Sequence, residues 1–262
     1  MDLRDTSIAA SPDARFVLKP LPILLAVVLG LGIIALSAIT VDTAEHFLHL
    51  VDRPTMRWID EGYVELAQLF YTCVAIFIMQ RTYAGEYGLK WPEGKSYVGQ
   101  ALLWGVVFGI VATLTDYAPQ LIAHRPPSQP YGLTPINITG WLTFDGIISS
   151  TSDETLLRGL LVTYLAAAMP GRVSFGGYRM NGAGVVVAVL YALAHIGNFF
   201  LMPFLMALAQ ILYLFAQGVL LAYWFEKSGS LLAPIVGRGV TNLIERLCVF
   251  AMVWAWAPPH VF

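Results

Sequence analysis

Long apolar runs separated by short polar segments are the main pattern along this chain. One stretch of 46 residues, 180–225, contains no Asp, Glu, Lys or Arg. A bilayer crossing needs about 20 consecutive apolar residues, so this stretch has room for two crossings. The runs lack the alternating pattern of β-barrel strands, and backbone groups inside a bilayer must be bonded within the chain, so we expect helices. The pattern therefore predicts an all-α, polytopic integral membrane protein.

About seven membrane-spanning helices are predicted. They cover residues 20–41, 63–80, 97–118, 141–169, 181–197, 200–225 and 232–256. The first could instead belong to a signal peptide, because Arg15 and Lys19 precede its apolar run. The run exceeds the roughly 7–15 residues typical of such a peptide, so we interpret it as a retained anchor. The chain has no internal repeat and no linker, and a single membrane domain over residues 1–262 is expected.

Composition supports the membrane assignment and excludes other classes. Charged residues make up 12% of the chain, against about 25% in soluble domains, and mean hydropathy is +0.67. The net charge is −2 and no Lys/Arg run occurs, which excludes nucleic acid as a partner bound through a basic patch. Cys73 and Cys248, the only cysteines, lie in apolar runs, so neither a disulfide framework nor a cysteine zinc site is expected.

The distribution of Lys and Arg predicts the orientation, because cytoplasmic loops carry an excess of both. With the N-terminus inside, nine fall in inner segments: Arg4, Arg15, Lys19, Arg81, Lys90, Lys95, Arg172, Arg179 and Lys227. Three fall in outer segments: Arg53, Arg57 and Arg125. We therefore expect a multi-pass protein of the inner cell membrane, with a cytoplasmic N-terminus and an outer C-terminus.

The fourth predicted span carries charged residues, which are costly inside a bilayer and usually face a cavity or a partner. Glu154 and Arg158 are spaced i, i+4 and lie on one helix face, so we expect an ion pair. Asp153 points about 100° away and is left for another partner. One reading is a salt bridge that only stabilises the helix packing, since buried charge clusters are often structural.

Polar groups in later spans give a second reading. His195 lies in the fifth span, and Arg238 and Asn242 lie one helical turn apart in the seventh. At 1.5 Å per residue from the assumed cytoplasmic ends, Glu154 is about 22 Å deep, His195 about 21 Å, Asn242 about 15 Å and Arg238 about 9 Å. These four could line one cavity that opens toward the cytoplasm. A lone histidine could equally be a packing residue.

Three short motifs in these spans resemble the CPBP family of membrane-embedded CAAX proteases and bacteriocin-processing or immunity proteins. Residues 153–158 resemble its Glu-Glu-x-x-x-Arg motif, and 191–195 resemble Phe-x-x-x-His. Residues 238–242 resemble His-x-x-x-Asn, and the run 228–235 before them is also typical of the family. The resemblance implies a CPBP-type helical core over 141–256, in the C-terminal half, preceded by N-terminal helices without a motif over 1–140.

The resemblance implies a proteolytic site. Asp153 would be the general base that activates a water molecule, and Glu154 with Arg158 would be an ion pair that orients it. His195 would be a partner of the water or of the oxyanion.

In the third motif, Asn242 would be an oxyanion donor and Arg238 a second donor. No cofactor and no metal are expected. His195 is the only histidine of the motif region, and a zinc site needs about three or four protein ligands.

Two departures from the family pattern leave two functions open. Asp153 replaces a Glu and Arg238 replaces a His, with Tyr191 for Phe a minor third change. An ion pair between Asp153 and Arg238 would occupy the base and silence the site. Two functions therefore remain. In one, the chain is an intramembrane endopeptidase that acts on a peptide, prenylated or membrane-bound substrate. In the other, it is a catalytically silent relative that serves as a structural or binding subunit of a membrane complex. A transporter is disfavoured because no repeat relates the two halves.

Overall fold

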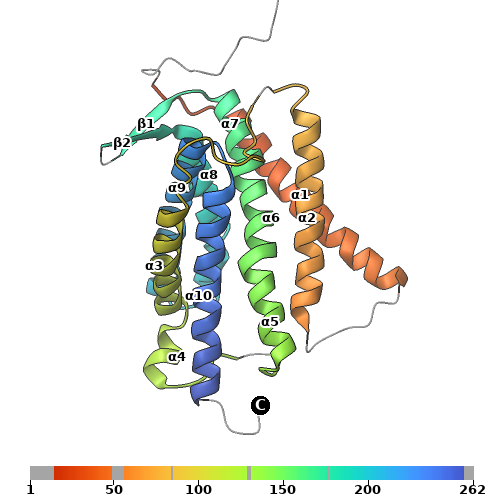
Figure 1. The fold of residues 1–262 in the computed structure, drawn as a ribbon, viewed down its shortest axis with the longest axis vertical. Helices are drawn as coiled ribbons and strands as arrows, with labels where there is room; N and C mark the ends of the chain where they lie inside the picture. Colours follow the sequence, from red (N-terminus) through yellow and green to blue (C-terminus); the bar gives the residue numbers. More distant parts are fainter. Residues whose placement is uncertain (1–14, 49–55, 84, 129–130, 176, 257–262) are drawn as a thin grey trace, which may run out of the picture.

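The computed structural model describes residues 15–48, 56–83, 85–128, 131–175 and 177–256, and most of them are helical (Figure 1). The first half contains α1 (Pro20–Leu48), α2 (Arg57–Met79), α3 (Val98–Asp116) and α4 (Ala118–Ala123). The second half contains one long helix in five segments, then α8 (Gly182–Leu193), η3 (Ile196–Phe200), α9 (Phe204–Ser228) and α10 (Leu232–Trp256). The segments of the long helix are α5 (Pro135–Thr143), η1 (Phe144–Ser149), α6 (Ser150–Glu154), η2 (Thr155–Val162) and α7 (Thr163–Ala168).

The mostly helical structure agrees with the predicted fold class, but a short hairpin that the sequence pattern did not predict lies between the long helix and α8. There, β1 (Arg172–Phe175) and β2 (Tyr178–Asn181) form an antiparallel hairpin. The short connection between the two strands lets their backbone groups pair with each other.

Among the described residues, five helices are long and apolar enough to cross a membrane, which indicates a multi-pass membrane protein. They are Pro20–Phe47, Arg57–Met79, Val98–Asp116, Gly182–Phe200 and Phe204–Ser228. The other two predicted spans, 141–169 and 232–256, are also helical but contain the charged motif residues. Their charges are tolerated because both helices pack inside the bundle, α10 against α3, α6 and α9.

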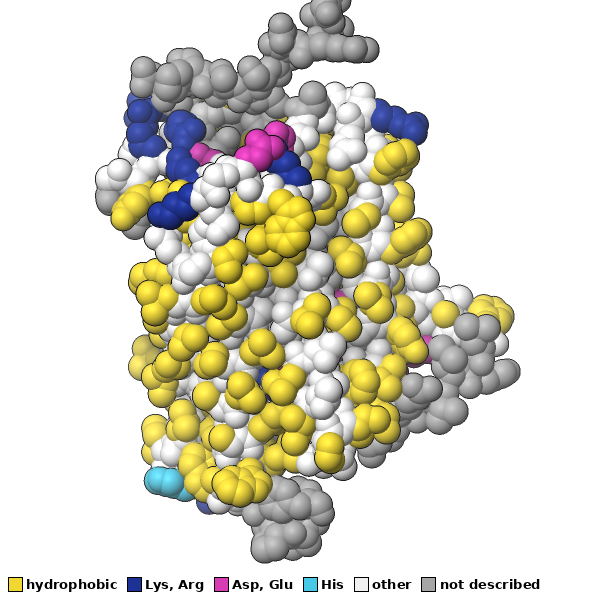
Figure 2. Space-filling view, in the orientation of Figure 1, with side chains coloured by type: hydrophobic (Ala, Val, Ile, Leu, Met, Phe, Trp, Pro, Cys, Tyr) yellow, Lys and Arg dark blue, Asp and Glu magenta, His cyan; other side chains and the backbone are white. Residues whose placement is uncertain are grey.

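Successive long helices run in opposite directions (Figure 1). We call the end of the bundle that holds β1 and β2 the hairpin end, and the opposite end the α4 end. Figure 2 shows hydrophobic side chains over the sides of the bundle and most Lys and Arg side chains at the hairpin end. A band of apolar side chains along the helices is the surface that the hydrocarbon core of a bilayer requires.

Local sequence determines where the helices of the motif region begin. The Thr134 hydroxyl accepts a hydrogen bond from the Asn137 amide at 3.3 Å, and Pro135 occupies the first turn of α5. The Asn181 side chain likewise accepts from the Ala183 amide at 2.9 Å at the start of α8. Such caps bond amides that have no partner within the helix.

The long helix is π-helical on both sides of α6, in η1 and η2. Asp153 and Glu154 therefore lie at the end of a short α-helical segment between two widened turns. π-Helical turns are rare and frequently occur at functional sites.

Glycines allow α10 to approach its neighbours closely. A Cβ on Gly239 would lie 2.3 Å from the Gly146 carbonyl oxygen in η1, and one on Gly105 would lie 2.8 Å from the Gly237 carbonyl oxygen. Small residues at such contacts let helix backbones pack together in membranes. The Gly239 contact holds the adjacent Arg238 against α6.

Gly239→Ala is expected to lower stability by about 1–3 kcal/mol, because the clash is with backbone and the helices must move apart. The measurement is thermal unfolding in detergent. Gly32→Ala is the matched control, since nothing lies within 4 Å of a Cβ at that position of α1. Equal melting temperatures for the two variants would contradict the close packing.

Candidate functional site

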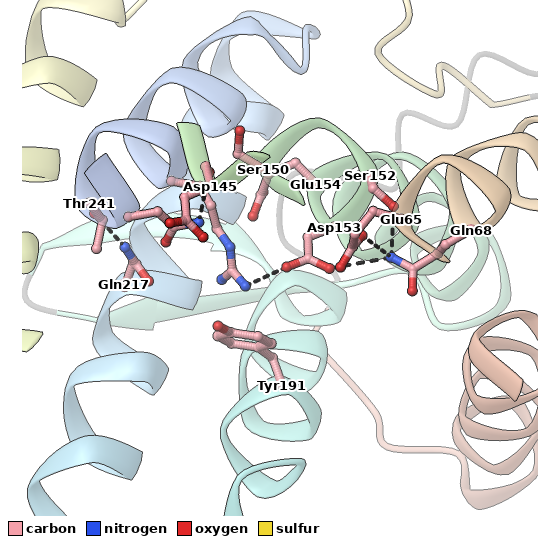
Figure 3. Close-up of polar contacts among 12 residues, drawn as sticks. Glu65, Gln68, Asp145, Ser150, Ser152, Asp153, Glu154, Tyr191, Gln217 and Thr241 are labelled. Atoms are coloured by element: carbon pink, nitrogen blue, oxygen red, sulfur yellow. Dashed lines mark hydrogen bonds and ion pairs between the residues drawn. The ribbon is translucent and has the colours of Figure 1, made fainter. Parts of the chain in front are cut away.

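An ion pair between α10 and α6 lies at the centre of the site (Figure 3). The Arg238 guanidinium donates from Nη2 to Asp153 Oδ2 at 2.6 Å. The guanidinium carbon also lies 4.5 Å from the centre of the Tyr191 ring, in a cation–π contact. The Arg238 side chain is 9% exposed and that of Asp153 24%. Asp153, which has no partner within the first motif, is thus paired with Arg238, the arginine that replaces the histidine of the third motif.

Helix α2 contributes to the site from outside the motif region. The Gln68 amide nitrogen is 2.9 Å from Ser152 Oγ, 3.3 Å from Asp153 Oδ1 and 3.3 Å from Glu65 Oε2, so its two N–H groups are shared among three acceptors. Both carboxylate oxygens of Asp153 are therefore engaged. We did not predict Glu65 or Gln68 as site residues, although a glutamate inside an apolar span was a signal for one of them.

Glu154 and Arg158 form the ion pair that their spacing predicts. Arg158 Nη1 donates to Glu154 Oε1 at 2.9 Å, and both side chains are fully buried. Arg158 Nη2 donates to the Gly218 carbonyl of α9 at 3.1 Å. In the described part of the chain, Glu154 Oε2 and Arg158 Nε have no hydrogen-bond partner. The pair thus links the motif helix to α9.

His195 and Asn242 each contact a backbone carbonyl. His195 lies two residues beyond Leu193, the last residue of α8, and its Nδ1 lies 3.1 Å from the Tyr191 carbonyl oxygen. Asn242 Nδ2 donates to the Asp145 carbonyl oxygen at 3.1 Å. The Asn242 contact thus joins α10 to η1, while the His195 contact is made with the last turns of α8.

A polar cavity of about 180 Å³ brings three candidate residues together. It is lined by Asp116, Tyr191, His195, Gln210, Tyr213, Leu214, Gln217, Arg238, Thr241, Asn242 and Glu245. We call it the site cavity. Asp153 contacts Arg238, which lines the site cavity. Glu154 and Arg158 do not line the cavity and are fully buried in the packed interior.

Two glutamines of α9 make hydrogen bonds beside the site cavity. Gln217 Nε2 donates to Thr241 Oγ1 of α10 at 2.8 Å. Gln210 Oε1 accepts from Asn198 Nδ2 in η3 at 2.5 Å. Both residues line the cavity and also join neighbouring elements.

A second cavity of about 180 Å³ adjoins the first and shares Asn242 and Glu245 with it. Arg246 lies beside it, donating from Nε to Asp145 Oδ2 at 2.5 Å and from Nη1 to the Tyr131 hydroxyl at 3.1 Å. Burial raises the pKa of the Tyr131 phenol, so this hydroxyl stays neutral and can accept that bond. We did not predict this cluster, because no motif contains its members.

No group of three or more His, Cys, Asp or Glu side chains among the described residues is arranged to hold a metal ion. Cys73 and Cys248 are free thiols.

Comparison with known proteins gives one match. Residues 135–244 match the family model for type II CAAX prenyl endopeptidase Rce1-like proteins. The match includes all six candidate residues and excludes α1, α2 and α3. No curated protein and no solved structure matches the chain.

Proposed function

Because residues 135–244 form an Rce1-like domain of the CAAX protease family, we propose that the protein is an intramembrane endopeptidase. It hydrolyses a peptide bond in a peptide or membrane-bound polypeptide. The observation that carries the proposal is the convergence of three motif segments on one polar site within an apolar bundle. Arg238 contacts Asp153, and Arg238, His195 and Asn242 line one cavity.

The proposed arrangement in the membrane has seven crossings, with α10 and the long helix of residues 135–168 as the two polar ones. The hairpin end is cytoplasmic and the α4 end is outside. Eight of the described Lys and Arg residues lie at the hairpin end: Arg15, Lys19, Arg81, Lys90, Lys95, Arg172, Arg179 and Lys227. Residues 1–140 support the core formed by 141–256, and α2 supplies Gln68 to it.

In the proposed reaction, Asp153 accepts a proton from a water molecule whose oxygen attacks the scissile carbonyl carbon. The C–N bond then breaks, and the proton passes from Asp153 to the leaving amine. Glu154 and Arg158 hold the end of α6 in place. His195 and Asn242 stabilise the oxyanion or the water.

Arg238 has to leave Asp153 before the carboxylate can accept a proton, because an ion-paired carboxylate is a weak base. The negative oxygen of the tetrahedral intermediate is a suitable new partner, since a guanidinium donates strongly to oxyanions. Arg238 Nε has no hydrogen-bond partner among the described residues, so it has a donor to spare. We propose that substrate binding moves the guanidinium from Asp153 to the substrate carbonyl.

The Asp153–Arg238 contact also favours a second function. If the pair never opens, the site is silent, and the protein serves as a structural or binding subunit of a membrane complex. Both oxygens of Asp153 are engaged, one by Arg238 and the other by Gln68, which supports this alternative.

Turnover by the wild-type protein distinguishes the two functions. Purified protein in proteoliposomes is incubated with a farnesylated CAAX peptide and with single-span polypeptides that carry randomised flanks. New peptide termini are identified by mass spectrometry, and an endopeptidase is expected to produce them at defined positions. A protein that unfolds cooperatively but cleaves none of these probes supports the silent alternative and contradicts the endopeptidase.

A further inference from the structure

The site cavity lies toward one end of the bundle. Asp116 is the last residue of α3, His195 follows the end of α8, and Tyr213 lies in the first half of α9. Those three helix ends, and the second half of α10 with Glu245, lie at the α4 end (Figure 1).

The cavity residues on the middle turns of α9 and α10, around the ion pair, are buried. Arg238 is 8% exposed, and Gln217 and Thr241 are 3% exposed each. Nearer the α4 end, Asp116, His195 and Glu245 are half-buried, while Gln210 is buried. The adjoining cavity continues to Val249, about 16 Å along α10 from Arg238 at 1.5 Å per residue. The polar space therefore runs from the ion pair to the α4 end.

Packed apolar side chains close the route from the hairpin end. Between Arg238 and that end, Ala101, Leu221, Trp224 and Ala233 form a buried cluster in which none exceeds 2% exposure. A larger apolar cluster packs beside it, between the long helix, α1, α2 and α8. The cavity at the hairpin end, about 270 Å³, is lined by none of the six candidate residues.

We infer that water and substrate reach the site from the α4 end. Together with the proposed orientation, this places access on the outer face of the membrane. The substrate of the proposed endopeptidase is then a membrane-anchored polypeptide whose scissile segment lies outside the cytoplasm. The statement about the substrate rests on the proposed function. The position of the opening does not depend on that function.

The charges at the opening indicate which outer segment fits. Asp116, Asp145 and Glu245 line the two cavities together with Arg246 and Arg238, and Arg238 is already paired with Asp153. An excess of carboxylates attracts a cationic segment and repels a free C-terminal carboxylate. We therefore expect the segment next to the scissile bond to carry Lys or Arg.

Cysteine labelling tests the side of access without requiring turnover. In a background with Cys73→Ser and Cys248→Ser, single cysteines are introduced as Tyr213→Cys in the site cavity and Thr163→Cys in the hairpin-end cavity. Lys90→Cys and Arg125→Cys mark the two membrane faces. Each variant is exposed to a membrane-impermeant methanethiosulfonate in spheroplasts and in inverted vesicles.

The cysteine at position 213 is expected to react in spheroplasts together with the cysteine at 125, and to stay unreactive in inverted vesicles. Reaction from the same face as position 90, or from neither face, overturns the proposed access. Labelling of position 90 in spheroplasts overturns the outer location of the substrate. If labelling follows expectation but no probe is cleaved, the endopeptidase proposal fails while the access route stands.

A matched pair of single-span substrates tests the charge preference in proteoliposomes. The two differ only in having Lys or Glu residues on the flank that faces the α4 end. Faster cleavage of the Lys substrate is expected, and equal or reversed rates contradict the charge argument.

Discussion

Asp153→Asn is expected to abolish peptide cleavage, with a loss of at least about 10²–10⁴-fold in turnover, because an amide cannot accept the proton of the attacking water. The measurement is the rate of product formation for any probe that the wild-type protein cleaves. Melting in detergent is recorded in parallel, since the change also removes the charged partner of Arg238. A variant that folds normally and cleaves at the wild-type rate would contradict the role of Asp153 as base.

Two double variants separate catalysis from structure. Asp153→Asn with Arg238→Gln removes both charges, so it should recover stability lost by stranding a buried guanidinium, but not activity. Asp153→Glu with Arg238→His restores the family pattern and is expected to increase turnover. If the wild type cleaves nothing and Asp153→Asn only destabilises it, the silent alternative is supported.

Arg158→Ala is expected to lower the free energy of unfolding by about 3–5 kcal/mol, because it leaves the Glu154 carboxylate charged and without a cation in the packed interior. Both side chains are fully buried, so water cannot replace the lost partner. The change also removes the donor to the Gly218 carbonyl of α9. The measurement is thermal or denaturant unfolding in detergent, and this result is expected whether or not the protein is an enzyme.

Two controls accompany Arg158→Ala. Lys90→Ala removes an exposed cation from its pairs with Glu86 and Glu93 and should leave the melting temperature unchanged. Glu154→Leu with Arg158→Met removes both buried charges and should recover much of the lost stability. A wild-type melting temperature for Arg158→Ala would contradict a structural role for the pair.

Sequence reasoning was most accurate where one local rule dominates. The length of an apolar run determines whether a helix can cross a bilayer, so the helices match the predicted spans closely; residues 97–118 contain α3, Val98–Asp116. Helix geometry alone places Glu154 beside Arg158, four residues later. The three motifs were sufficient to identify the family, which the family model confirms for residues 135–244.

The long-range contacts of the site could not be predicted in the same way. Asp153 and Arg238 are 85 residues apart in sequence, and Asp145 and Arg246 are 101 apart. The sequence suggested the contact between Asp153 and Arg238, because a buried guanidinium needs a carboxylate. It could not exclude a site in which the Asp153 carboxylate faces an open cavity. Nothing in the motifs pointed to Gln68.

The sequence by itself determined a multi-pass helical membrane protein with an Rce1-like domain at residues 135–244, because bilayer thickness and helix periodicity act on neighbouring residues. Only the tertiary structure decided which carboxylate Arg238 contacts, that α2 contributes Gln68 to Asp153, and that β1 and β2 pair. The lining of the two polar cavities, from which we infer access at the α4 end, also depends on tertiary packing; with the proposed orientation, this inference differs from the cytoplasmic opening that the sequence suggested. The physical reason is that these features depend on how helices distant in sequence pack, and close contacts such as that of Gly239 with Gly146 set that packing.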